Sequence, residues 1–307
     1  MSHRKLQAAA LLASLLSVAV AAGVGAGDNP GYTVVPDWPQ LPEGYKFGQV
    51  SAVAPDGHGN IYVFHRGEHP IIVFNRHGKL LRSFGDGVIK TAHGLRIDRQ
   101  GNLWTTDVGN HTVRKFSSEG KLLMTLGREG EPGETPEQFD KPADVAFGPH
   151  DELYVADGYG NSRVVKFSKD GKFIKAWGKK GKEEGEFNLV HAVVVDAHGT
   201  VYVGDRENNR VQIFDADGKF QGKWTEFGAP FGLFLDRDHH RFLVADGRAH
   251  KCLVLDPHGK VLESWGMEGA TPGQFNLPHS ISLDSDGAVY VTEIQGQRVQ
   301  KFVRKLP

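Results

Sequence analysis

The chain has 307 residues, which is enough for one large β domain or two average domains. Its formal net charge is −1 and no basic run stands out, which argues against nucleic acid and against an anionic membrane surface as main partners. The single cysteine, Cys252, excludes both an intramolecular disulfide and a zinc–cysteine site.

The N-terminal segment is typical of an export signal. His3-Arg4-Lys5 precedes an uncharged apolar stretch, residues 6–24, which small residues follow. An uncleaved anchor helix is the alternative, because the stretch nearly reaches the roughly 20 residues that span a bilayer. Its alanine-rich composition favours cleavage. We therefore expect a signal peptide at 1–27, a folded domain at 28–307, and an exported protein, periplasmic or secreted, with no stable membrane association after cleavage.

A repeating pattern begins after residue 46 and continues to the C-terminus. Its clearest unit starts at Leu95 and recurs at Val193, and weaker copies start near Ser51, Ala143, Phe231 and His279. This gives six units of roughly 40 to 50 residues, each with four short strands separated by turns rich in Gly, Asp and Asn. The pattern predicts an all-β fold, a six-bladed β-propeller.

The sixth unit has only three strands before the chain ends at Pro307. The segment Tyr32-Thr33-Val34-Val35 is well placed to supply the fourth strand. Such pairing closes the ring and leaves the last blade without an exposed edge.

Alignment of the six units on their first strand gives one column of residues. The column consists of Ser51, His93, Ala143, His191, Phe231 and His279. Because the first strand of a blade is innermost and alternate blades lie roughly 120° apart, the three histidines can meet on the channel axis. Three neutral imidazoles with an open fourth position are the ligand set of a catalytic zinc ion. Copper or iron would also accept imidazole, and three unrelated core histidines are the alternative to any metal site.

The turn after the second strand of each unit carries a second set of candidates. Four units have an Asp there, and in two of them an Asn comes shortly before an Arg; these residues can brace the turn through hydrogen bonds to the backbone. Arg66, Tyr159 and Arg206 depart from this pattern. Beside a metal, an Arg can hold a carboxylate and a Tyr can accept a proton, whereas a surface Arg and a packing Tyr are the alternative. His65 and His69 are expected to be rim residues.

Several motifs, in this order, resemble one known family. They are Gly48-Gln49-Val50-Ser51, Phe64-His65-Arg66-Gly67-Glu68-His69, His93-Gly94-Leu95, Thr106-Asp107-Val108, Asp157-Gly158-Tyr159-Gly160-Asn161-Ser162-Arg163, Asp205-Arg206-Glu207-Asn208 and Pro278-His279. Together they resemble the peptidyl-α-hydroxyglycine α-amidating lyases, which are NHL-repeat six-bladed propellers. The resemblance runs from about residue 38 to 303.

The resemblance implies a role for each candidate residue. It implies that His93, His191 and His279 bind a catalytic zinc ion, and that Arg66, Tyr159 and Arg206 serve the active site. The implied reaction splits a peptide that ends in α-hydroxyglycine into a peptide amide and glyoxylate. Tyr159 would take the proton of the substrate's hydroxyl group, and an Arg would hold the carboxylate.

The chain also departs from the family. The resemblance implies a structural calcium ion whose ligands are the backbone carbonyls of Val53 and Leu95 and an Asp directly after the third histidine. Here that residue is Ser280, which argues against calcium. Leu277 replaces an active-site Met two residues before His279, and the family's two disulfides are absent.

Three hypotheses follow from the sequence. The first is a monomeric zinc-dependent lyase that acts on a peptidyl- or N-acyl-α-hydroxyglycine, a small-molecule or peptide substrate with a carboxylate. The second is a non-enzymatic NHL propeller that binds a peptide, protein or glycan. The third is another metal-dependent hydrolase such as a lactonase, but these usually hold calcium with carboxylates, and the histidine column argues against it.

Overall fold

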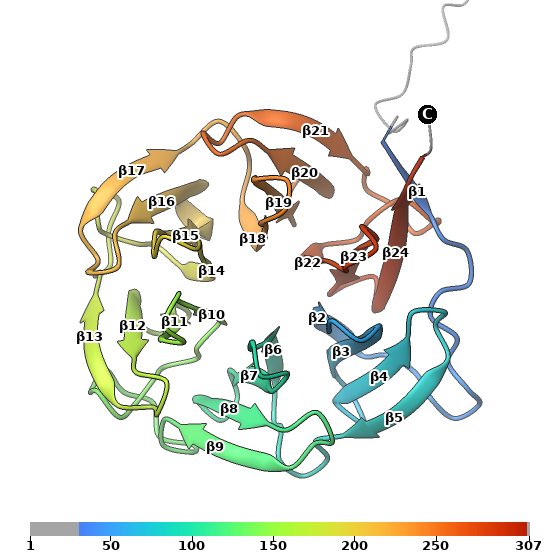
Figure 1. Cartoon of the computed structure of the whole chain (residues 1–307), viewed down its shortest axis with the longest axis horizontal. Helices are drawn as coiled ribbons and strands as arrows, with labels where there is room; N and C mark the ends of the chain where they lie inside the picture. Colours follow the sequence, from blue (N-terminus) through green and yellow to red (C-terminus); the bar gives the residue numbers. More distant parts are fainter. Residues whose placement is uncertain (1–30, 306–307) are drawn as a thin grey trace, which may run out of the picture.

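The strands form a ring of blades around a central axis (Figure 1). The computed structural model describes residues 31–305, and within this range there are six four-stranded antiparallel sheets. In each sheet the first strand of the repeat lies next to the axis and the last lies on the outer rim. The predicted all-β six-bladed propeller is confirmed.

The blades follow one another in chain order. Blade 1 contains β2 (Gln49–Pro55), β3 (Asn60–Arg66), β4 (Ile71–Asn75) and β5 (Leu80–Phe84). Blade 2 contains β6 (Ala92–Ile97), β7 (Leu103–Asp107), β8 (Thr112–Phe116) and β9 (Leu122–Leu126). Blade 3 contains β10 (Asp144–Phe147), β11 (Leu153–Asp157), β12 (Arg163–Phe167) and β13 (Phe173–Trp177).

The second half of the ring has the same organisation. Blade 4 contains β14 (Val190–Val195), β15 (Val201–Asp205), β16 (Arg210–Phe214) and β17 (Phe220–Trp224), with a short 3₁₀ helix, η1 (Arg206–Asn208), after β15. Blade 5 contains β18 (Pro230–Asp236), β19 (Arg241–Asp246), β20 (Lys251–Leu255) and β21 (Val261–Trp265). Blade 6 contains β22 (Pro278–Leu283), β23 (Val289–Glu293), β24 (Arg298–Arg304) and β1 (Tyr32–Val34).

The ring is closed by the N-terminal strand, as the sequence predicts. β1 pairs antiparallel with β24, with Tyr32 opposite Arg304 and Val34 opposite Phe302. The ring of Tyr32 stacks on Trp265 of blade 5 at a centroid distance of 4.7 Å. The two ends of the described chain therefore hold each other, and the outer edge of β24 is covered.

The hydrophobic core is divided into layers between neighbouring blades. Each of six buried clusters joins two adjacent sheets; one, for example, packs Val145 and Val155 of blade 3 against Trp104 of blade 2. An inner strand is covered on both faces, and all six residues of β14 are buried. This burial explains why the inner strands are almost continuously apolar in sequence and do not alternate between polar and apolar residues.

Buried carboxylates at the ends of the second strands brace the loops that enter the inner strands. Asp107 accepts hydrogen bonds from the backbone N–H groups of Lys90 and Thr91, just before His93. Asp157, Asp205, Asp246 and Glu293 make the same kind of contact in blades 3 to 6. The recurring acidic residues thus brace the turns, as predicted, and they fix where each inner strand begins.

The N-terminal prediction concerns residues that lie outside the described range. Residues 1–27, the expected signal peptide, belong to this part of the chain. Among residues 31–305, no helix is long and apolar enough to cross a bilayer.

Candidate metal centre

The three histidines of the even-numbered blades meet at one end of the channel. Each is the second residue of an inner strand: His93 in β6, His191 in β14 and His279 in β22. Their ring centroids are 4.9, 4.8 and 4.9 Å apart, and one ring nitrogen from each lies within 4.8 Å of the others. The structure therefore brings together three side chains from distant parts of the sequence.

The local cause of this convergence is a β-bulge. The pairing of each inner strand with its neighbour shifts register at His93, His191 and His279. The extra residue of a bulge has no partner across the ladder, and its side chain is re-aimed relative to the alternation of the strand. The same shift occurs at Ser51 and Phe231 of blades 1 and 5. The residues that the sequence aligns in one column are thus, except for Ala143, residues at β-bulges.

The Nδ1 atom of each histidine is held by a backbone carbonyl of the next blade. His93 contacts the carbonyl oxygen of Ala143 at 2.7 Å, His191 that of Phe231 at 2.6 Å, and His279 that of Ser51 at 2.7 Å. A carbonyl only accepts, so each Nδ1 carries the proton and donates it. Each Nε2 therefore keeps a lone pair, which is the form that binds a metal.

Gly94 allows one of these contacts to form. A Cβ atom at residue 94 would lie 2.5 Å from the carbonyl oxygen of Ala143, closer than real Cβ contacts come. That oxygen is the acceptor for His93. A side chain at position 94 would therefore push the carbonyl away from the imidazole that it orients.

Burial keeps the three imidazoles neutral. His93, His191 and His279 are 2%, 2% and 5% exposed. Burial lowers the pKa of His93 and His191 well below the usual value, and neighbouring charged groups, including Arg206, act in the same direction. Burial lowers the pKa of His279 to about 3. At neutral pH all three side chains are in the form that can donate an electron pair.

This donor set fits a metal ion with one open coordination position. Three Nε2 lone pairs converge, and each ring is oriented by a hydrogen bond through its other nitrogen, as metal-bound histidines usually are. Zinc accepts three imidazoles in this way, and copper or iron also bind imidazole. Within residues 31–305 this is the one cluster of His, Cys, Asp or Glu that is tight enough to share an ion.

Tyr159 lies over the histidines from the turn after β11. Its hydroxyl oxygen is 3.0 Å from Nε2 of His93 and 3.0 Å from Nε2 of His191. Both nitrogens are acceptors, so the phenol donates to one of them at a time. Gly158 lets the turn approach β14, because a Cβ there would lie 1.9 Å from the carbonyl oxygen of Val190. Tyr159 is 37% exposed, so part of its ring faces the channel mouth.

Arg206, the first residue of η1, contacts Tyr159 from blade 4. Its Nη1 donates to the tyrosine hydroxyl at 3.1 Å, and its guanidinium lies over the ring of Phe231 at 4.5 Å. Glu207 accepts a hydrogen bond from its Nε at 3.0 Å. Burial raises the pKa of Tyr159, whereas the positive charges of Arg206 and Arg66 act to lower it.

Arg66 approaches the same site from blade 1. Its Nε donates to the carbonyl of Ala92 at 3.0 Å, next to His93, and its Nη1 donates to Gln49 at 2.8 Å. These bonds use two of the five N–H groups of the guanidinium. The structure thus gathers Arg66, Tyr159 and Arg206 on one face of the propeller, around the mouth above the histidines.

The expectation that His65 lies on the rim is wrong. His65 is fully buried, accepts a hydrogen bond from the Gly48 N–H at its Nδ1 (3.1 Å) and lies 3.1 Å from the His69 carbonyl through its Nε2. It pairs with Val50, as the bracing carboxylates of blades 2, 4, 5 and 6 pair with the residue before the bulge. In blade 1 an imidazole therefore replaces the bracing carboxylate and supports the loop next to Arg66.

Below the histidines, an arginine forms an ion pair with the neighbouring blade and reaches across the channel. Arg96 of β6 donates to both carboxylate oxygens of Asp144, from Nε at 3.1 Å and from Nη2 at 2.7 Å. Its Nη2 also donates to the carbonyl of Leu233 in blade 5 at 2.9 Å. This pair is not among the residues predicted from the sequence. A signal is present, because Arg96 and Asp144 are charged residues in two inner strands that are largely buried.

Other contributors were missed because they act through groups that residue type does not reveal. Ser51, Ala143 and Phe231 appear in the column, but it is their backbone carbonyls that orient the histidines. Gln49 and Glu207 hold the two rim arginines. Gln49 lies in the motif Gly48-Gln49-Val50-Ser51, from which no role for its side chain is predicted.

Comparison with known proteins places these features in context. The NHL repeat model matches residues 91–116, 139–167 and 187–214. NHL repeat-containing protein 3 of Mus musculus is 34% identical, with 90% of this chain and 85% of that protein covered. Peptidyl-alpha-hydroxyglycine alpha-amidating lyase 2 of Drosophila melanogaster is 30% identical, with 91% and 77% covered.

Two further comparisons concern longer relatives and the fold. Peptidyl-glycine alpha-amidating monooxygenase A of Xenopus laevis is 33% identical over 87% of this chain, which spans about a third (32%) of that protein. Among solved structures, a streptogramin B lyase superposes with a TM-score of 0.65 at 14% identity, covering 90% of this chain and 98% of the other. At that identity the likeness shows the propeller fold alone.

Proposed function

We propose that this chain, which belongs to the family of NHL-repeat proteins that includes NHL repeat-containing protein 3 and the peptidyl-α-hydroxyglycine α-amidating lyases, is a zinc-dependent carbon–nitrogen lyase. Its substrate is a peptidyl- or N-acyl-α-hydroxyglycine, and its products are an amide and glyoxylate. The observation that carries the proposal is the convergence of three neutral imidazoles beneath Tyr159 and two arginines.

The rim can hold the carboxylate of such a substrate. Arg66 has N–H groups left after its bonds to Ala92 and Gln49, and Arg206 lies across the mouth beside Tyr159. A guanidinium binds a carboxylate through two parallel hydrogen bonds, which fixes the orientation of the ligand as well as its charge. In our proposal Arg66 anchors the carboxylate and thereby sets the α-carbon above the histidines.

The reaction needs a base for one proton. The hydroxyl group of the substrate loses its proton, the C–O bond becomes the carbonyl of glyoxylate, and the electron pair of the breaking C–N bond goes to nitrogen, which takes up a proton. Held by the three Nε2 atoms, zinc would supply a Lewis acid that polarises the hydroxyl oxygen of the substrate. The protein's own side chains would hold the carboxylate and transfer the proton.

Tyr159 is the residue we assign as that base. Its oxygen is within hydrogen-bond distance of two Nε2 atoms, so it lies beside the position that the substrate oxygen would take. Burial raises the pKa of Tyr159, and the positive charges of Arg206 and Arg66, together with a dication held by the histidines, would favour the phenolate. After proton transfer, the resulting phenol is positioned to return the proton to the departing amide nitrogen.

The cellular setting is also part of the proposal. We propose an exported, monomeric enzyme that acts on a small molecule or peptide with a carboxylate and that does not bind nucleic acid. A channel mouth that carries two cationic side chains suits a small anionic substrate. A test is to fractionate the native host and to measure the mass of the mature protein.

Metal analysis joined to an activity assay tests the lyase proposal. We expect one zinc ion per chain and release of glyoxylate from a model N-acyl-α-hydroxyglycine, both lost in His93→Ala. His258→Ala is the matched control, because His258 is exposed and lies in a turn of blade 5, and it keeps both properties. A wild-type chain without stoichiometric metal would refute the proposal.

The same experiment separates a second candidate. The name of NHL repeat-containing protein 3 states no reaction, and the alignment with this chain covers 85% of that protein. That observation favours a propeller that binds a peptide, protein or glycan without catalysis. In that case His93→Ala would change neither metal content nor ligand binding.

A further inference from the structure

Below the histidine level, the channel has a second level built from the residues that follow the column. Arg96 lies three residues after His93, and its guanidinium reaches Asp144 of blade 3 and the Leu233 carbonyl of blade 5. Asp144 also accepts the backbone N–H of Val193 in blade 4 at 3.2 Å. One ion pair therefore links four of the six inner strands across the axis.

This level contains the kinds of oxygen atom that could hold a cation. Leu233 occupies in blade 5 the position that Val53 and Leu95 occupy in blades 1 and 2, two residues after the column. Asp144 occupies in blade 3 the position of Ser280 in blade 6. The Leu233 carbonyl and the carboxylate are bound by the guanidinium, and the Val53 carbonyl accepts the hydroxyl of Ser282 at 2.7 Å.

The space that remains lies against a fixed positive charge, which does not suit a calcium ion. Between the histidines and Arg96 there is a cavity of about 20 Å³, enough for about one water molecule. Calcium takes six to eight oxygen ligands, and here it would lie against a fixed positive charge. The side chains of Arg96 and Asp144 are 16% and 8% exposed, so solvent screens this charge only weakly. The residues present do not fit a calcium ion.

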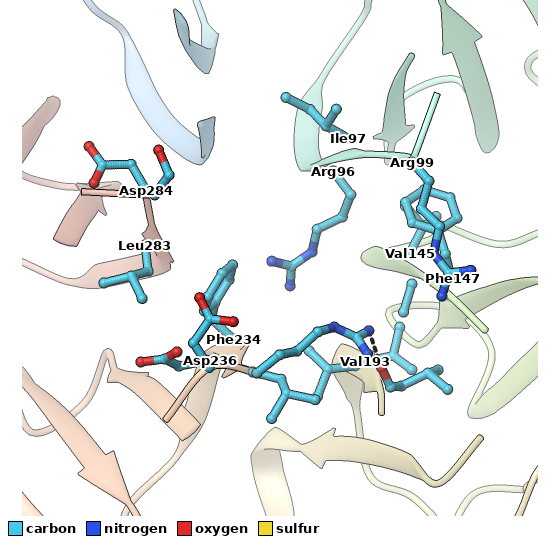
Figure 2. Close-up of a pocket in the computed structure, with 17 residues that line it drawn as sticks. Arg96, Ile97, Arg99, Val145, Phe147, Val193, Phe234, Asp236, Leu283 and Asp284 are labelled. Carbon is cyan, nitrogen blue, oxygen red and sulfur yellow. Dashed lines mark hydrogen bonds between the residues drawn. The ribbon is translucent and has the colours of Figure 1, made fainter. Parts of the chain in front are cut away.

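Arg96 also separates the two ends of the channel. A pocket of about 550 Å³ opens on the face opposite the histidines, with Ile97, Val193, Phe234 and Leu283 in its walls. Figure 2 shows Arg96 extending into this pocket from its strand. Because Arg96 lines both this pocket and the small cavity under the histidines, it forms the partition between them.

We propose that Arg96 is a built-in cation of the channel, which takes the place of a bound dication and positions the histidine centre from below. Asp144 directly follows Ala143, whose carbonyl accepts hydrogen bonds from His93 at 2.7 Å and from the hydroxyl of Thr106 at 2.9 Å. The ion pair holds this segment in place. Arg96 is thus a positioning residue, and the metal centre does not depend on calcium.

The wild-type protein provides the first test. We expect isothermal titration with calcium chloride to show no binding, and thermal unfolding with and without calcium to give the same midpoint. One equivalent of bound calcium with a raised midpoint would overturn the proposal. Neither readout involves turnover, so the result is independent of whether the chain is a lyase.

Removal of the charge provides the second test. Arg96→Met leaves the Asp144 carboxylate without its cation, and we expect at least a tenfold loss of zinc affinity in a chelator competition, as for other residues that orient metal ligands. The same variant should gain a calcium-dependent rise in its unfolding midpoint. Wild-type zinc affinity without any calcium response would contradict the proposal.

Two controls make the second test decisive. The double variant Arg96→Met, Asp144→Asn removes both charges, so it should fold without a calcium response and still bind zinc more weakly than wild type. It decides the zinc comparison if the single variant does not fold, and wild-type zinc affinity in it would overturn the positioning role. Arg304→Met removes an exposed arginine at the end of β24 that pairs with Glu263, and it should leave both readouts unchanged.

Discussion

The even-numbered and odd-numbered blades share one backbone design but contribute to the channel in different ways. Blades 2, 4 and 6 each place a histidine side chain on the axis, whereas blades 1, 3 and 5 each place a backbone carbonyl against the histidine of the preceding blade. The carbonyls belong to Ala143, Phe231 and Ser51. A six-fold repeat thus supports a three-fold cluster, in which one half of the blades supplies the imidazoles and the other half orients them.

This difference shows at which positions of the channel a particular residue type is required. A ligand position needs an imidazole, since only a side chain can supply the nitrogen. An orienting position needs a carbonyl, which every residue has, so this contact does not restrict its side chain. The difference explains why His appears in three units and Ser, Ala and Phe in the other three.

The strongest test of the division compares the two members of one contact, His279 and Ser51. His279→Ala removes a ligand, and we expect zinc affinity to fall more than about 100-fold, with loss of glyoxylate release. Ser51→Ala removes a hydroxyl that bonds to the Phe64 carbonyl but keeps the backbone carbonyl that accepts from His279. It should retain one zinc ion per chain. Loss of metal in Ser51→Ala would break the comparison.

The pH dependence of stability in the metal-free protein gives the next largest effect. Folding lowers the pKa of His93, His191 and His279, so below about pH 6.5 the unfolded chain binds more protons than the folded chain. Stability is therefore present above that pH and falls as the pH decreases, by about 1.4 kcal/mol per pH unit for each histidine. For His279 the window extends down to about pH 3.

Urea denaturation at a series of pH values measures this slope. The odd-numbered blades have no titratable side chain in the column, but burial also lowers the pKa of His65 in blade 1, so a substitution is needed to isolate the contribution of the column. His279→Gln should reduce the slope between pH 6.5 and 5 by about one proton. An unchanged slope would show that His279 does not titrate as a buried neutral group.

Tyr159 sharpens the comparison, because an odd-numbered blade here supplies a side chain. Tyr159→Phe keeps the ring that packs edge-on against His93 and His191 but removes the hydroxyl. We expect kcat to fall about 100-fold, the lower end of what a positioned base contributes, while zinc content stays at one per chain. If the Phe variant lost zinc instead, the hydroxyl would belong to the metal centre and not to the chemistry.

The fold and the convergence of the three histidines could be predicted from the sequence for a physical reason. Residue types alone reveal the blade period, the turn residues and the alternation of His93, His191 and His279. The Ala143, Phe231 and Ser51 carbonyls could not be predicted, because every residue carries a carbonyl and its direction depends on the bulge. His65 was misplaced for a related reason. A single sequence does not distinguish a buried imidazole that replaces a bracing carboxylate from a histidine on the rim.

The smallest predicted effect concerns Gln49, a second side chain from an odd-numbered blade. Its amide oxygen accepts a hydrogen bond from Nη1 of Arg66 at 2.8 Å, while Nε of Arg66 is held by Ala92. Gln49→Ala removes one of the two restraints on the guanidinium. A single hydrogen bond contributes about 1 kcal/mol, so we expect KM to rise about fivefold.

A change confined to KM would identify Gln49 as a residue that orients the carboxylate anchor. The value of kcat should change less than about twofold, because the bond acts on substrate placement and not on the proton transfer. Gln221→Ala, on the exposed outer strand β17, is the matched control and should leave both constants unaltered. If kcat fell while KM stayed constant, Arg66 would act in the transition state, and blade 1 would contribute to the chemistry as directly as the histidine blades do.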